Sequence, residues 1–168
     1  MKGSVKRVHN ALVAAGYSAD FLRFAESTRS SEEAAAAVGC AVGQIAKSLV
    51  FRTRTDDRPV LVIASGANRV GPERVSDIVG DGIAQADATF VRARTGFAIG
   101  GVAPLGHKDA PIVVIDEDLL AFDTIWAAAG APNVVFRIDP CHLEAMTGGV
   151  VARVREDRAS LTLVSSRR

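Results

Sequence analysis

The segment at residues 44–51, QIAKSLVF, constrains the fold more than any other stretch, because it places a lysine inside an apolar strand. Its sequence predicts a helix end leading into a strand, and side chains on a strand alternate between its two faces. Lys47 therefore shares a face with Leu49 and Phe51, where an ammonium group is costly to bury. Two interpretations stay open: Lys47 extends to the surface with its stem over Leu49, or it serves a functional site.

Lysine is rare in this chain, which has four lysines against sixteen arginines. The two residue types are not interchangeable, because the lysine ammonium is a compact point charge and the arginine guanidinium is a planar fork. A sequence that otherwise uses arginine thus has a point charge at position 47. This bias singles out Lys47, but its spacing alone still favours the interpretation in which it extends to the surface.

A second unusual segment, TGFAIGGVAPLGH at residues 95–107, has four glycines and one proline within an apolar stretch and ends in a histidine. Glycine permits positive φ and close approach of the backbone to a ligand. Successive free N–H groups in such a loop can bind an anion, although many glycine-rich segments are simple turns.

Four blocks together, at residues 28–39, 44–51, 65–70 and 95–107, resemble the YbaK/ProX family in order and spacing. This family comprises free-standing relatives of the editing domain of bacterial prolyl-tRNA synthetase. The resemblance covers nearly the whole chain. It implies hydrolysis of the ester that joins a wrong amino acid to the 3′ end of a tRNA, without a metal or an organic cofactor.

The resemblance also implies which residues form the site. Lys47 stands at the family's functional lysine, and residues 100–104 stand at its GxxxP loop beside the substrate. One departure is Gly71, which replaces an expected aspartate after Arg69 and Val70. We therefore expect catalytic roles for Lys47, Gly100 and Gly101, and a substrate contact from Pro104. From their positions in the sequence we also expect substrate contacts from Ser48, Asn68, His107 and Asn133. Local hydrogen bonding within a turn or loop stays open as the alternative for Ser48, Asn68 and His107.

Composition limits the class of protein. A chain of 168 residues with 48% hydrophobic residues suits a single domain with one substantial core. A net charge of +1 and a pI near 7.8 argue against a protein that coats DNA or long RNA. No apolar run approaches the length of a membrane span, and we expect a cytoplasmic protein. Cys40 and Cys141 lie far apart, which predicts free thiols, and no ligand spacing predicts a metal site.

Short helices alternate with short strands along the chain, which indicates an α/β or α+β fold with a mixed sheet. Helices are predicted to begin at the Ser30 and Asp87 caps and at Pro72, and a hairpin is predicted over 47–52 and 60–64. Further strands are predicted at 21–25, 112–115, 125–128, 134–138 and 150–154. The family resemblance implies a curved, partly barrel-like sheet surrounded by helices. We expect one domain over 1–158, with a loosely attached segment that begins near Arg155 and a tail over 159–168.

Two functional hypotheses remain. The first is a trans-acting deacylase for mischarged tRNA, with tRNA-Pro carrying a small wrong amino acid as the expected substrate and prolyl-tRNA synthetase as an expected partner. The second is a binding module that recognises a nucleotide or an RNA end without hydrolysis. The absence of an evident general base keeps the second hypothesis open.

Overall fold

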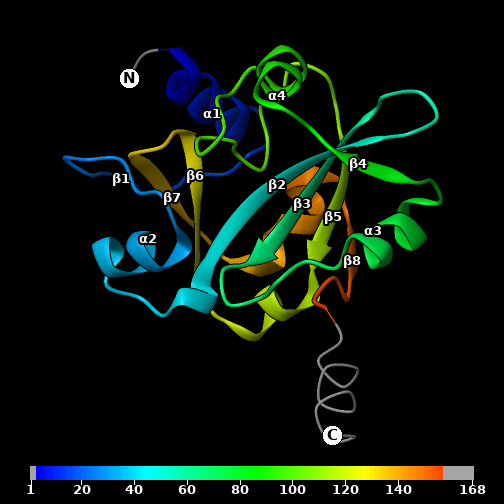
Figure 1. Ribbon diagram of the computed structural model, residues 1–168. Helices are drawn as coiled ribbons and strands as arrows, with labels where there is room; N and C mark the ends of the chain where they lie inside the picture. The colour runs from blue at the N-terminus through cyan, green and yellow to red at the C-terminus, as the bar shows by residue number, and fades with distance from the viewer. Residues whose placement is uncertain (1–2, 157–168) are drawn as a thin grey trace, which may run out of the picture.

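A single eight-stranded mixed sheet with short helices around it forms the fold (Figure 1). The computed structural model describes residues 3–156. The helices are α1 (Gly3–Ala14), α2 (Ser31–Val38), α3 (Pro72–Val79), α4 (Ala88–Thr95) and α5 (Leu143–Thr147), with 3-10 turns at Val42–Gln44, Glu117–Ala121 and Pro140–His142. The strands are β1 (Phe21–Arg23), β2 (Ile45–Thr53), β3 (Pro59–Ser65), β4 (Ile83–Gln85), β5 (Ile112–Asp116), β6 (Ile125–Ala131), β7 (Val134–Ile138) and β8 (Val150–Ala152).

The strand order is β1-β7-β6-β2-β3-β5-β8, and β4 pairs with the far end of β2. The β2–β3, β2–β4, β6–β7 and β1–β7 pairs are antiparallel, whereas β2–β6, β3–β5 and β5–β8 are parallel. The mixed sheet predicted from the hairpins is therefore confirmed. Within residues 3–156, no helix is long and apolar enough to cross a membrane.

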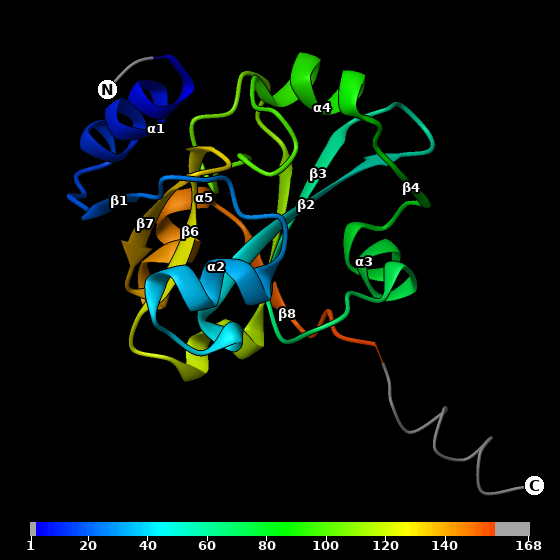
Figure 2. The same cartoon turned by 60° about the vertical axis from the view of Figure 1, so that its left-hand side comes forward.

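Strand β3 is the centre of the fold, because every one of its residues is buried. Leu61 and Ile63 belong to the larger core, which α1 covers together with the loop around Phe97. Val60 and Val62 face a second core that α3 closes. Figure 2 shows α1 and α3 on opposite sides of the strands. A strand covered on both faces has no free face for solvent, which explains its uninterrupted apolar sequence.

The parallel contact between β2 and β6 is short. It consists of the pairs Ile45–Trp126 and Ala46–Ala127. The next residues along the two strands, Lys47 and Ala128, line a cavity instead of continuing the ladder. The sheet therefore opens where β2 separates from β6, and the cavity lies at this opening.

The predicted helix starts are confirmed in detail. Ser30 Oγ accepts from Glu33 N at 3.1 Å, and the Asp87 carboxylate accepts from Phe90 N at 2.8 Å. The helix predicted at Pro72 begins there, although Gly71 caps it without a side-chain hydrogen bond. These local signals are readable from sequence because each depends on residues within one helical turn.

Two segments differ from what the sequence predicts. The sequence does not predict strand β4, because its three residues carry too little periodicity to indicate a strand. The segment that begins at Arg155 is expected to be loosely attached, yet Arg155 forms a bridge with Val70 and an ion pair with Asp118 at 2.8 Å. The predicted tail at 159–168 lies outside the described residues.

Gly130 determines how closely α1 packs on β6. Its φ is +99°, and a Cβ at this position would lie 2.6 Å from Ser4 O. Ser4 Oγ also donates to the Gly130 carbonyl at 2.6 Å. Any side chain would therefore push α1 away from the sheet.

We expect Gly130→Ala to lower the free energy of unfolding by at least about 2 kcal/mol more than Gly148→Ala does. Gly148 also has positive φ, at +70°, but a Cβ added there would meet nothing within 4 Å. Its substitution therefore reports backbone strain alone, about 1–2 kcal/mol. Urea denaturation of both variants measures the difference, and equal losses would contradict a steric role for Gly130.

Candidate active site

A cavity of about 380 Å³ opens where β2 separates from β6. Five parts of the chain line it: the start of α2 with the residues before it, the first half of β2, the β6–β7 hairpin, the position just after β3 at Gly66, and the glycine-rich loop at Gly100 and Val102. The lining residues are Thr28, Arg29, Ser30, Ser31, Glu32, Ala34, Ile45, Ala46, Lys47, Ser48, Gly66, Gly100, Val102, Trp126, Ala128, Pro132, Val134 and Val135. This volume is at the lower end of the range for small-molecule sites.

Three charged side chains are present in the lining, from Arg29, Glu32 and Lys47. Arg29 and Glu32 flank the start of α2, whose N-terminus is capped by Ser30 and carries partial positive charge. Lys47 approaches from β2. The cavity thus combines two cationic groups with one carboxylate against an otherwise apolar and small-residue wall.

Lys47 is half-buried, and its Nζ donates a hydrogen bond of 2.6 Å to the main-chain oxygen of Asn68. Burial lowers the pKa of the Lys47 ammonium below its ordinary value, and the carboxylates of Glu32 and Asp116 oppose part of that shift. The sequence places Lys47 on the same strand face as Leu49 and Phe51, and that face is apolar in the structure, because both residues pack in the second core. Lys47 ends that row at the edge of the cavity.

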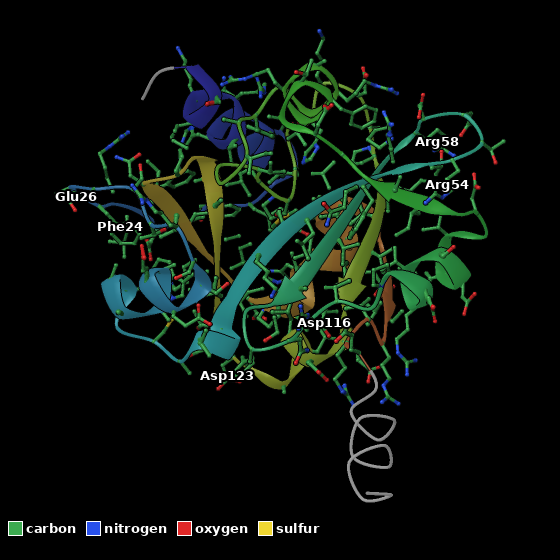
Figure 3. The ribbon with its side chains drawn as sticks, in the orientation of Figure 1. Phe24, Glu26, Arg54, Arg58, Asp116 and Asp123 are labelled. Carbon is green, nitrogen blue, oxygen red and sulfur yellow. The ribbon has the colours of Figure 1, made fainter. Side chains whose placement is uncertain are left out.

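Asn68 lies beside the cavity without lining it. Its side-chain nitrogen donates to Asp116 Oδ2 and to Asp118 Oδ2, each at 2.8 Å. Asp116 is fully buried at the end of β5, where Figure 3 labels it, and it also accepts from Ser65 N at 3.0 Å. The Asn68 side chain is therefore occupied by protein groups, while its carbonyl holds Lys47.

The two central glycines of the GxxxP segment have different environments. Gly100 lines the cavity with φ of +92°, and its N–H has no protein acceptor within residues 3–156. Gly101 N instead donates to Ala98 O at 2.9 Å, and a Cβ on Gly101 would lie 2.9 Å from Ala131 Cα. Gly100 thus lines the cavity and has a backbone N–H without a partner in residues 3–156, whereas Gly101 allows close packing against β6.

Ser48 lies between the cavity at Lys47 and a smaller, mostly apolar one of about 190 Å³, and it lines both. Its Oγ is buried without a hydrogen-bond partner in the described part of the chain. Gly100 and Val102 also belong to both linings. A buried hydroxyl without a partner carries a desolvation cost that a hydrogen bond would relieve.

Three other expected contact residues lie outside the cavity lining. Pro104 is buried, and Asn133 donates from Nδ2 to Phe24 O at 3.2 Å. His107 Nε2 donates to Ala103 O at 2.6 Å, and its ring contacts Phe97 edge to face. His107 thus orders the glycine-rich loop from behind.

The start of α2 and the residues of the β6–β7 hairpin that line the cavity have no direct role predicted from the sequence. The pattern at residues 28–33 indicates a helix cap, and Ser30 does cap the helix. The same residues also place Arg29 and Glu32 on the cavity, together with Trp126 from β6. The sequence does show two charged residues, Arg29 and Glu32, on either side of the Ser30 cap. Only the tertiary fold brings this pair close to Lys47.

The structure brings together one group of potential metal ligands that the spacing of residues in the sequence does not predict. Asp139, Cys141 and His142 have ligand atoms within 4.8 Å of one another on an exposed turn. None of them lines the cavity at Lys47, although Asp139 and His142 line a separate cavity of about 420 Å³. Cys141 and Cys40 are both free thiols, as predicted.

Comparison with known proteins agrees with this geometry. The model of the aminoacyl-tRNA editing domain matches residues 25–146, and the chain belongs to that family. An uncharacterised protein of Bacillus subtilis, YwhH, is 32% identical over 124 residues, which are 74% of this chain and 78% of the relative.

Two solved structures share the fold closely. One is described as a candidate trans-editing enzyme for prolyl-tRNA synthetase; it is 42% identical, has a TM-score of 0.87, and the match covers 94% of this chain and 99% of the other. The second is described only as a hypothetical protein, with 28% identity, a TM-score of 0.83, and coverage of 89% and 99%. The mixed α/β architecture is thus that of the editing-domain fold.

The environment of His107 predicts a pH dependence of stability. Burial lowers its pKa below the ordinary 6.5, and Arg7 acts in the same direction, while the bond to Ala103 O opposes them. Below pH 6.5 the unfolded chain therefore binds a proton that the folded chain resists. Stability falls as the pH drops from 6.5 towards the lowered pKa, by at most about 1.4 kcal/mol per pH unit.

We expect His107→Gln to remove this part of the acid sensitivity, since glutamine does not titrate. Urea denaturation between pH 7.5 and 5 measures the pH dependence of the unfolding free energy. His9→Gln is the control, because it removes an exposed histidine. An unchanged pH slope in His107→Gln would contradict the assignment.

Proposed function

We propose that this protein is a trans-acting aminoacyl-tRNA deacylase that hydrolyses the ester of a mischarged tRNA. The proposed substrate is tRNA-Pro carrying a small wrong amino acid. Membership of the editing-domain family supports the reaction, and the similar protein described as a candidate trans-editing enzyme for prolyl-tRNA synthetase supports the choice of tRNA.

The charge pattern of the cavity is the observation that carries the proposal. The end of an aminoacyl-tRNA combines anionic phosphates with the cationic α-ammonium of the amino acid. Arg29 and Lys47 suit the phosphate and ribose end, and the Glu32 carboxylate suits the ammonium. A nucleotide alone would present no cation for Glu32, which favours the aminoacyl ester over a simple RNA end.

Hydrolysis needs little from side chains, because the aminoacyl ester is already reactive. Water adds to the ester carbonyl, and the tetrahedral oxyanion then collapses with loss of the ribose oxygen. The proton released by water ends on that ribose oxygen, so the products are a free amino acid and a tRNA with a free hydroxyl. The main requirement is stabilisation of the oxyanion and correct placement of the ester.

In this proposal Gly100 donates its free N–H to the oxyanion, and Lys47 holds or polarises the end of the substrate. Loss of one oxyanion donor typically costs about 10²–10³ in rate. Gly101 serves the loop by close packing, because its own N–H is occupied. His107 and Pro104 act through the loop, and Ser48 offers a hydroxyl to the ribose or the amino acid.

We further propose that the reaction needs no metal and takes place in the cytoplasm, where tRNA is charged. Prolyl-tRNA synthetase is the proposed partner that delivers the substrate, since a net charge of +1 provides little long-range attraction for RNA. The competing function is an RNA-end binding module without hydrolysis.

The deciding experiment is a deacylation assay with a panel of tRNAs that carry different wrong amino acids, with and without a chelator. The proposal expects ester cleavage on alanyl- or another small aminoacyl-tRNA-Pro and no loss of rate with the chelator. Binding of the panel without cleavage would favour the binding module, and loss of activity that zinc restores would refute metal independence.

We expect Lys47→Ala to lower the deacylation rate at least about tenfold, the equivalent of 1.4 kcal/mol of transition-state stabilisation. Its melting temperature should stay equal or rise, because a partly desolvated charge is removed. Lys108→Ala is the matched control, since Lys108 is an exposed lysine that directly follows the glycine-rich segment at residues 95–107. A fully active Lys47→Ala protein would exclude the proposed role.

We expect Glu32→Gln to reduce kcat/KM about tenfold on an ordinary aminoacyl-tRNA, because a charge-assisted bond to the ammonium is lost. On the N-acetylated aminoacyl-tRNA, which lacks that charge, the variant and the wild type should be equal. Glu33→Gln is the control, because Glu33 Oε1 accepts from Arg29 N outside the cavity lining. Equal losses on both substrates would show that Glu32 does not read the ammonium.

A further inference from the structure

The hydrogen bonds around Asn68 form a continuous chain from the C-terminal segment, residues 154–156, to Lys47. Arg155 Nη1 donates to both carboxylate oxygens of Asp118, at 2.9 and 2.8 Å. Asp118 Oδ2 accepts one side-chain N–H of Asn68, and Asp116 Oδ2 accepts the other. The main-chain oxygen of Asn68 then accepts from Lys47 Nζ.

An amide side chain suits this position. An asparagine amide has two N–H donors and can satisfy two carboxylates at once. An aspartate in its place would add a third negative charge, and an alanine would leave Asp116 short of a donor while it remains fully buried. Because both partners are acceptors, the orientation of the amide is unambiguous.

The C-terminal segment holds the other side of the same loop. Gly71 N donates to Val154 O at 2.8 Å, and Glu156 N donates to Arg69 O at 2.8 Å. The loop that follows β3 is thus bonded on one side to residues at the end of β5 and on the other to residues 154–156. Its carbonyl at position 68 has little freedom to move.

On the basis of the proposed function, we propose that Asn68 is a positioning residue that holds the Lys47 ammonium at the cavity, and that Arg155 and Asp118 extend this support to the C-terminal segment. The Asn68 side chain itself does not touch substrate. It acts through its own backbone, because fixing the amide fixes the carbonyl to which Lys47 donates.

Two carboxylates act on the charge of Lys47. Glu32 lines the cavity from α2, and Asp116 lies at the end of β5. Asp118 and Arg155 form an ion pair with each other, and Asp118 reaches Lys47 only through Asn68. Removal of Asn68 therefore changes the position of the ammonium more than the net charge around it.

A double-mutant cycle between Asn68 and Lys47 tests the proposal. Under single-turnover conditions we expect Asn68→Ala to lower the rate at saturating tRNA about tenfold, with half-saturation changed less than about twofold. In a Lys47→Ala background the same substitution should cost less than about twofold, because the group it positions is absent. Equal losses in both backgrounds, or a wild-type rate in Asn68→Ala, would overturn the proposal.

A second pair of variants covers the case in which Asn68→Ala fails to fold. Arg155→Ala should lower the rate about threefold, and Arg155→Lys should restore it, since a single nitrogen makes both contacts with Asp118. Arg137→Ala, which breaks an exposed pair with Asp20, is the matched control and should be neutral. Failure of lysine to restore the rate would overturn the role of Arg155.

Lysine NMR separates this proposal from the proposed function, because it needs no catalysis. The chain has four lysines, so the Lys47 signal is identified by its loss in Lys47→Arg. In Asn68→Ala and Arg155→Ala the Lys47 side-chain signal should move towards those of the other three lysines. An unmoved signal overturns the positioning role even if the enzyme is active, and a moved signal supports it even if no tRNA is cleaved.

Discussion

The candidate site depends on how one ammonium group is accommodated at the edge of an apolar sheet. Lys47 continues the row of Leu49 and Phe51, which pack in the core beside α3. Such a group is stable only with a hydrogen-bond acceptor and nearby negative charge. The Asn68 carbonyl supplies the first, and Glu32 and Asp116 supply the second. The loop after β3, the end of β5 and the start of α2 are all arranged around this need.

The same requirement explains why polar residues gather at one end of the sheet. Asp116 is fully buried and accepts from Ser65, Asn68 and Asp118, so each carboxylate oxygen has a partner. A buried carboxylate without such donors would be strongly destabilising. Here it joins the ends of β3 and β5 and sets the loop that faces Lys47. Stability and site geometry thus rely on one set of bonds.

In the proposed reaction, backbone groups supply most of the remaining chemistry of the cavity. Gly100 presents an N–H at a positive φ that side chains rarely adopt, while Gly101 and His107 keep the loop in place. Groups of this kind are fixed before substrate arrives, which is what electrostatic stabilisation of an oxyanion requires. The cavity therefore suits a reaction whose substrate is already activated.

Local sequence patterns are sufficient for much of the fold. The cap at Ser30, the helix start at Pro72 and the β2–β3 hairpin each depend on neighbours within a few residues, and each prediction is confirmed. Strand β4 escapes prediction because it exists only through pairing with β2, and the prediction for Arg155 is wrong because its partner Asp118 is 37 residues away. Contacts of that kind leave no periodic signal in the sequence.

For the site, the sequence by itself determined that Lys47 lies at an apolar strand edge and that a glycine-rich loop accompanies it. It also determined the family, through four blocks in order. Only the tertiary structure decided that Gly100 has a free N–H while that of Gly101 is occupied, that Asn68 faces two carboxylates, and that Glu32 reaches the cavity. The physical reason is that residue type sets which bonds a group can make, whereas long-range packing decides which partners lie within reach.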